Sequence, residues 1–153
     1  MDKKDIETAH NYFSKHCFNK TWDFIDKDNL SESEKVQMIS SAFASLYHWS
    51  NREDQTNQNL SVGYWQLSRV FAVLQDGANA LKFANLCLDV SQNDDVSEFY
   101  LGYAYEALAR SEMVNGNADE MNDYLKEANT IGSDLVDKDE KDYLLADLNT
   151  IKL

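Results

Sequence analysis

Residues 97–131 read SEFYLGYAYEALARSEMVNGNADEMNDYLKEANTI, and this stretch decides the class of fold. Its apolar residues recur every three or four positions in two runs, which are Leu101, Tyr105 and Leu108, then Met121, Leu125 and Ala128. This spacing is typical of one face of an α-helix. The tripeptide Asn115-Gly116-Asn117 lies between the runs and is long enough only for a tight turn. We therefore predict helices over about 97–115 and 118–131 that pack antiparallel as a hairpin.

The same helical spacing continues through the rest of the chain. It predicts helices from Ile6 through Phe24, around Val36–Leu46, and over about 60–75, 78–90 and 139–151. The expected buried faces carry Ile6, Ala9, Phe13 and Cys17, then Val36, Ile39, Phe43 and Leu46, then Tyr64, Leu67 and Phe71, then Ala80, Phe83, Ala84 and Cys87, and finally Leu144, Leu148 and Ile151. No β-branched alternating run competes with these helices. The sequence therefore predicts an all-α fold of about seven helices in a single domain, residues 1–153.

Capping residues mark where several of these helices begin. Ser31 with Glu34 has the spacing of a capping box, in which a hydroxyl and a carboxylate bind free amides at the helix start. The same spacing recurs with Asp or Asn as the cap, at Asp95 with Glu98, Asn117 with Glu120, and Asp137 with Glu140. These pairs predict helix starts near residues 32, 96, 118 and 138.

A shift of 41 residues aligns two predicted hairpins without a gap. It places Leu60 on Leu101, Tyr64 on Tyr105, Leu67 on Leu108, Ser68 on Ala109, Val73 on Val114, Phe83 on Tyr124, Cys87 on Ala128 and Val90 on Ile131. Because one shift aligns both helices of both hairpins, the chain is predicted to contain a structural repeat.

Gly102–Ser133 resembles a tetratricopeptide repeat (TPR). Tyr105 lies where that motif prefers a large aromatic, Leu108 and Ala109 replace its Leu-Gly pair, and Gly116 opens its turn. In its second helix Met121 stands in for the first small residue and Leu125 for the large one, while Ala128 matches the second small one. Residues 61–92 resemble it less closely, through Tyr64, Leu67, Ser68, Ala80 and Ala84, with a displaced turn. Neither repeat ends in proline, and a period of 41 exceeds the usual 34 or so. The resemblance implies a TPR-like right-handed α-solenoid, with 1–50 a divergent first helix pair, 60–91 and 97–132 TPR-like hairpins, and 139–151 a capping helix.

The resemblance also implies a concave binding surface lined by the first helix of each pair. Its exposed row would carry Val62, Trp65, Arg69 and Ala72, then Tyr103, Glu106, Arg110 and Met113. Arg69 and Arg110 are two of only three arginines and lie at equivalent positions of the repeat. Beside Trp65 and Tyr103 they would bind a carboxylate or acidic group of a peptide. The candidate binding residues are therefore Trp65, Arg69, Tyr103, Glu106, Arg110 and Met113.

The two arginines also have a purely structural interpretation. Glu106 lies four residues before Arg110, the spacing of a favourable helical ion pair. Trp65 lies four residues before Arg69, where a cation–π contact is equally local. The residues alone leave both interpretations open.

Composition limits the classes of partner. Fourteen basic and 27 acidic side chains give a formal charge of −13, which disfavours nucleic acid because phosphate binding needs a basic surface. No apolar run is long enough to span a membrane, and the opening residues do not resemble a signal peptide. The two cysteines lie among apolar neighbours and are expected to be reduced and buried. We expect a cytoplasmic protein, monomeric or weakly homo-oligomeric.

The search for catalytic and metal motifs yields only isolated residues. Glu7-Thr-Ala-His10 is a single Glu-x-x-His, whereas di-iron bundles need two. His16 and His48 lack acidic or cysteine partners at metal-binding spacing, so no metal or cofactor is expected. The sequence therefore favours a non-enzymatic protein- or peptide-binding module. A small-ligand sensor or enzyme with a site between helices, and a homo-oligomeric structural protein, remain the alternatives.

Overall fold

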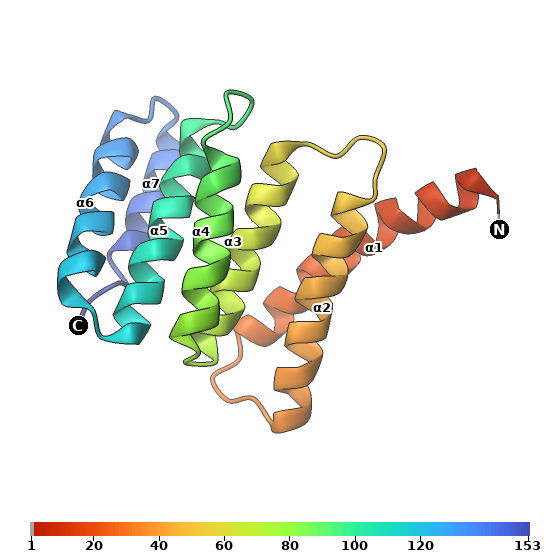
Figure 1. Ribbon diagram of the computed structural model, residues 1–153, viewed down its shortest axis with the longest axis horizontal. Coiled ribbons are helices and arrows are strands. Elements are labelled where there is room, and N and C mark those ends of the chain that lie inside the picture. Colours follow the sequence, from red (N-terminus) through yellow and green to blue (C-terminus); the bar gives the residue numbers. More distant parts are fainter. Residues whose placement is uncertain (1) are drawn as a thin grey trace.

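The computed structural model describes residues 2–153, which form seven α-helices and no strand. The helices are α1 (Lys3–Ile25), α2 (Glu32–Ser50), α3 (Asn57–Val73), α4 (Gly77–Ser91), α5 (Glu98–Asn115), α6 (Ala118–Asp134) and α7 (Lys138–Leu148) (Figure 1). The all-α class and the number of helices are confirmed. The first helix runs on through Phe24 as expected, whereas the last ends at Leu148 and leaves Ile151 in the C-terminal segment after a turn.

The helices are arranged so that each packs on its neighbours in sequence. In addition α3 packs on α5, α5 on α7 and, more weakly, α1 on α3. Within residues 2–153 the backbones of α2 and α4, and those of α4 and α6, do not come this close, although the Phe43 ring on α2 packs edge-on against the Phe83 ring on α4 with 5.7 Å between their centroids. The odd-numbered helices therefore adjoin one another. Figure 1 shows α2, α4 and α6 nearer the viewer than α1, α3 and α7.

The buried apolar residues form three clusters that follow one another from α1 to the C-terminal tail. Phe24, Met38 and Leu67 centre one cluster, Ala84 and Leu108 a second, and Met121 with Leu144 a third. Leu67 and Leu108, related by the 41-residue shift, are both fully buried. Burying a leucine completely contributes about 1.5–3 kcal/mol, so the two equivalent helices are fixed in the core through equivalent residues.

The α1–α2 hairpin packs only in part through the residues expected, since Ile39 and Leu46 lie against the first core cluster as predicted. Ile6, Phe13, Val36 and Phe43 of the predicted buried faces are all more than 40% exposed. Ser14 and Ser45 are buried instead, and the Ser45 hydroxyl donates to the Ser14 carbonyl across 2.8 Å. Small polar side chains let the two helices approach closely, and a hydropathy pattern does not mark them.

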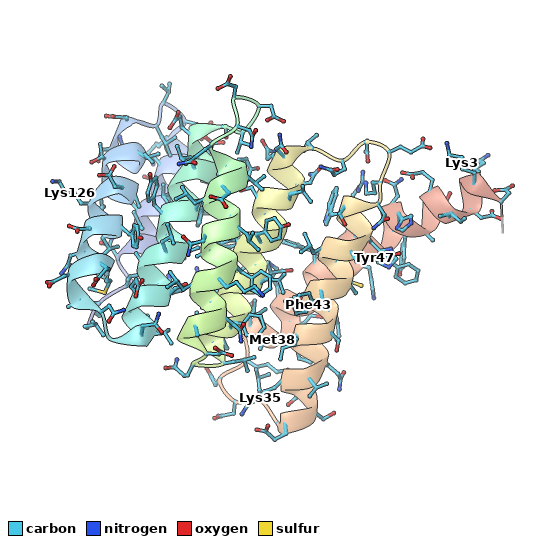
Figure 2. The ribbon with its side chains drawn as sticks, in the orientation of Figure 1. Lys3, Lys35, Met38, Phe43, Tyr47 and Lys126 are labelled. Carbon is cyan, nitrogen blue, oxygen red and sulfur yellow. The ribbon has the colours of Figure 1, made fainter. Side chains whose placement is uncertain are left out.

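Large aromatic side chains consequently remain on the outside of this hairpin. Tyr12 and Tyr47 are about 60% exposed, and Figure 2 shows Phe43 and Tyr47 projecting from α2. The N-terminal part of α1 extends away from the rest of the molecule (Figure 1).

The helix starts follow the capping pattern with two corrections. Ser31 and Glu34 form the predicted capping box, and Asp137 accepts from the Glu140 amide. Asp95 does not cap α5, because Ser97 takes that position without a side-chain hydrogen bond. Asn117 is in the cap position of α6, but its amide group donates to Glu112 instead.

The two short turns have the same backbone structure. Gln75 and Gly116 end α3 and α5 in the left-handed region, with φ of 60° and 76°. The next residues, Asp76 and Asn117, each donate from the backbone to the carbonyl five residues earlier, at 2.9 Å. This is the Schellman motif. Gln75 and Gly116 are 41 residues apart, so the turns coincide in the repeat and the first is not displaced.

Among residues 2–153, no helix combines the length and the hydropathy needed to cross a bilayer.

Candidate binding groove

The two equivalent arginines converge on one buried carboxylate. Glu106 on α5 has no exposed surface. Its Oε1 accepts from Arg110 Nε at 2.6 Å and from Arg69 Nη2 at 3.1 Å. Its Oε2 accepts from the Trp65 indole at 2.9 Å. A charge buried this deeply needs such partners, because desolvation strongly disfavours an unpaired carboxylate.

A second carboxylate reaches the same cluster from α7. Asp147 Oδ2 accepts from the Tyr103 hydroxyl at 2.9 Å, and Asp147 Oδ1 lies 3.8 Å from Arg69 Nη2. Burial, and then the nearby charge of Asp147, raise the pKa of Tyr103 far above its usual range. The phenol is therefore held protonated as a hydrogen-bond donor.

The C-terminal segment covers Arg110. Its Nη2 donates to the Thr150 hydroxyl at 2.9 Å and to the Asp147 carbonyl at 3.3 Å. Gly102 leaves room for α7 here, because a Cβ at this position would lie 2.5 Å from Leu144 Cδ2 and the buried leucine side chain would have to shift. We call Arg69, Glu106, Arg110 and Asp147 the charge cluster.

The charge cluster is electrically balanced, with two guanidinium groups and two carboxylates. The predicted ion pair between Glu106 and Arg110 is present, as is the cation–π contact of Arg69 with Trp65 at 5.7 Å. The expectation that this row is exposed is wrong for Ala72, Glu106 and Arg110, which are buried. The structural interpretation of the arginines therefore accounts for their contacts, and they do not present an open anion site.

An apolar pocket lies beside the charge cluster, between α3 and α5. It encloses about 200 Å³ and is lined by Ser61, Val62, Trp65, Phe99, Tyr100 and Tyr103. A second pocket of about 340 Å³ adjoins it through Val62 and Tyr100. The second pocket reaches α1 and α2, and its other lining residues are Lys15, Phe18, Asn19, Trp49, Gln58 and Asn59. We call the two pockets together the aromatic groove.

The aromatic groove contains only part of the predicted site. Trp65 and Tyr103 line it, whereas Arg69, Glu106 and Arg110 belong to the charge cluster and Met113 packs against the core around α6 and α7. Sequence reasoning missed Phe99, Tyr100, Phe18 and Trp49. Phe99 and Tyr100 occupy the first turn of α5, and a helical period does not show whether such positions face a neighbouring helix or solvent.

The three histidines lie on the α1–α2 hairpin, and two of them are in contact. His10 and His48 are within hydrogen-bond distance, with 3.0 Å between their Nδ1 atoms, and His16 stacks on Tyr12. Burial, followed by the neighbouring His10, lowers the pKa of His48. Residues 2–153 contain no group of three or more His, Cys, Asp or Glu side chains placed to hold a metal ion.

Both cysteines are free thiols. Cys87 is buried beside Ser61 and Ser91, and burial raises its pKa to about 11. A thiol with so high a pKa is a poor nucleophile at neutral pH.

Comparison of the chain with protein-family models, with curated proteins and with solved structures finds no match. The groove is therefore interpreted from its own geometry.

Proposed function

We propose that this chain is a divergent TPR-like module that binds a peptide or protein segment in the aromatic groove. Three features support a TPR-like arrangement: the 41-residue period, the equivalent turns at Gln75 and Gly116, and the adjoining odd-numbered helices. In such an arrangement the first helices of successive pairs line one surface. The groove lies on helices α1, α3 and α5 of that row, with Trp49 contributed by α2.

The observation that carries the proposal is an accessible pocket with four aromatic walls. Trp65, Phe99, Tyr100 and Tyr103 surround space that no side chain of residues 2–153 fills. Aromatic side chains are over-represented among the residues that dominate binding energy, because they present large rigid surfaces. The amide side chains of Asn19, Gln58 and Asn59 at the adjoining pocket supply hydrogen bonds for a peptide backbone.

The partner inferred from the groove differs from the one expected from the sequence. Arg69 and Arg110 are neutralised by Glu106 and Asp147, so recognition of a carboxylate has no support. The α3–α5 pocket is lined by uncharged residues, and Lys15 is the one charged residue lining the rest of the groove. The proposed ligand is therefore a segment that inserts apolar side chains.

Selection from a phage-displayed library of random linear dodecapeptides tests this proposal. Tyr100→Ala removes a wall shared by both pockets, and Tyr143→Ala on α7 is a matched control because its side chain is exposed and lies outside the groove. Peptides selected on the wild type should bind Tyr100→Ala about tenfold or more weakly, as expected for loss of an aromatic anchor. Their affinity for Tyr143→Ala should stay within about twofold. Equal binding to wild type and Tyr100→Ala, or failure to select any peptide, contradicts the proposal.

A further inference from the structure

The aromatic groove continues at its α5 end into a larger pocket. This pocket encloses about 880 Å³ between the start of α5, the end of α6 and the start of α7. Phe99 lines both this pocket and the α3–α5 pocket, so the two adjoin. Its lining combines apolar side chains with carboxylates: Phe99, Ile131, Leu135 and Val136 with Glu98, Asp134, Asp137 and Glu140. We call it the acidic pocket.

The lining of the acidic pocket has four carboxylates and one cation, a net excess of three negative charges. Lys138 is the one basic residue in the lining, and it pairs with Asp142 outside it. Within residues 2–153, Glu98, Asp134 and Glu140 make no ion pair and accept no side-chain hydrogen bond, and only Asp137 is engaged, as the cap of α7. The pocket therefore carries negative charge that the protein does not neutralise.

Helix stability explains only some of these carboxylates. Glu98 and Glu140 lie in first turns, where an acidic side chain favours the positive end of the helix dipole. Asp134 is the last residue of α6, where the dipole disfavours a carboxylate. Its position at the pocket is therefore not explained by the helix that carries it.

We propose that the segment bound in the aromatic groove carries lysine or arginine side chains and that these occupy the acidic pocket. This inference rests on the proposed function. The apolar walls accommodate the hydrocarbon stem of such a side chain while the carboxylates receive its charged end. Lys15 at the opposite end of the groove repels a cation. The charge gradient thus orients the ligand, with its apolar part across Tyr100 and its basic part toward α7.

The dodecapeptide selection tests this orientation when it is combined with charge variants. The triple variant Glu98→Gln/Asp134→Asn/Glu140→Gln removes three charges from the pocket. The control Asp119→Asn/Glu120→Gln/Asp123→Asn removes three charges from exposed positions of α6 that line none of the pockets described above. Selected peptides should combine apolar residues with a basic cluster at one end. Their Kd should rise at least tenfold with the pocket variant and at most about twofold with the control.

The outcomes separate this inference from the function on which it rests. Peptides that lose affinity for Tyr100→Ala, yet lack basic residues and bind the pocket variant unchanged, support the aromatic groove and overturn the occupant assigned to the acidic pocket. Peptides insensitive to Tyr100→Ala overturn the proposed function. Dimerisation of the protein that disappears in the pocket variant, measured by analytical ultracentrifugation without peptide, identifies a second copy as the occupant and also overturns the assignment.

Discussion

The hairpins α3–α4 and α5–α6 share their repeat positions but differ in what surrounds them. Leu67 and Leu108 are buried equally, and the turns at Gln75 and Gly116 make the same hydrogen bonds. The α3–α4 hairpin packs against α1, α2 and α5, whereas α5–α6 packs against α3, α4 and α7. Equivalent residues therefore meet different neighbours.

The difference is concentrated at two pairs of repeat positions. Trp65 and Glu106 are 41 residues apart, and the side chain at the second position accepts a hydrogen bond from the side chain at the first. Arg69 and Arg110 are also equivalent, yet Arg110 is held by α7 and the tail while Arg69 keeps its Nε without a partner in residues 2–153. A repeat thus places side chains at equivalent positions, whereas the groups that bind those side chains come from whichever helices lie next to them.

The largest expected effect follows from removing the shared partner. Glu106→Ala leaves the buried guanidinium of Arg110 and the partly buried guanidinium of Arg69 short of a counter-ion, and the Trp65 indole without its acceptor. Breaking a buried ion pair on one side costs about 3–5 kcal/mol. For a chain of this length that lowers Tm by about 2–4 °C per kcal/mol, or by roughly 10 °C in calorimetry. Glu127→Ala, at an exposed position of α6, is the control, and an equal Tm for the two variants would refute the structural role of Glu106.

A smaller effect is the difference in stability expected between the Arg110→Ala and Arg69→Ala variants. Arg110→Ala removes bonds to Glu106, Thr150 and the Asp147 carbonyl. Arg69→Ala removes one bond to Glu106 and a longer contact with Asp147. Since each hydrogen bond to a charged group is worth about 1.5–3 kcal/mol, Arg110→Ala should be the more destabilising by about 1 kcal/mol or more in urea unfolding.

The reverse order of stability would show that the α7 contacts of Arg110 contribute little. Equal destabilisation by the two substitutions would show that the equivalent arginines contribute equally to the free energy of unfolding. In either case the double substitution should lower Tm, contrary to what an exposed pair of arginines predicts.

The smallest effect concerns the equivalent turns. A side chain at positive φ costs about 1 kcal/mol or more, and Gly116→Ala adds a Cβ with no atom within 4 Å, so φ alone sets its cost. Gln75→Gly relieves the same strain, but it also raises the conformational entropy of the unfolded chain. The free energy of unfolding should therefore rise by only about 0.5 kcal/mol. Urea unfolding of both variants measures these changes: the free energy of unfolding should fall for Gly116→Ala and rise for Gln75→Gly. Destabilisation by Gln75→Gly would show that the side chain at that turn contributes more than its backbone strain costs.

Much of the fold is predictable because its signals are local. The positions of α3–α6 follow from helical periodicity, and the Ser31 and Asp137 caps follow from residues three apart. The predicted faces fail in α1 and α2, where Ser14 and Ser45 form the contact and Phe13 and Phe43 stay exposed. Close packing of small polar residues depends on how two helices cross, and periodicity does not define that crossing.

The candidate site likewise has features that local sequence patterns predict and features that they do not. Trp65 and Tyr103 were found because the repeat places them in one row, and the local pair Glu106–Arg110 was anticipated from its four-residue spacing. The convergence of both arginines on Glu106, and the part of Asp147, were not anticipated. Asp147 lies 37 residues from Arg110 along the chain, and no local pattern connects them.

The sequence by itself therefore determined an all-α chain of seven helices, with two hairpins in a 41-residue register and an acidic surface. These properties depend on hydrogen bonds and apolar spacing within one turn of helix. Only the tertiary structure decided that the arginines are neutralised and that an aromatic groove, continued by an acidic pocket, remains open beside them. The reason is that the free energy of a buried charge depends on the partners that packing brings to it from distant parts of the sequence.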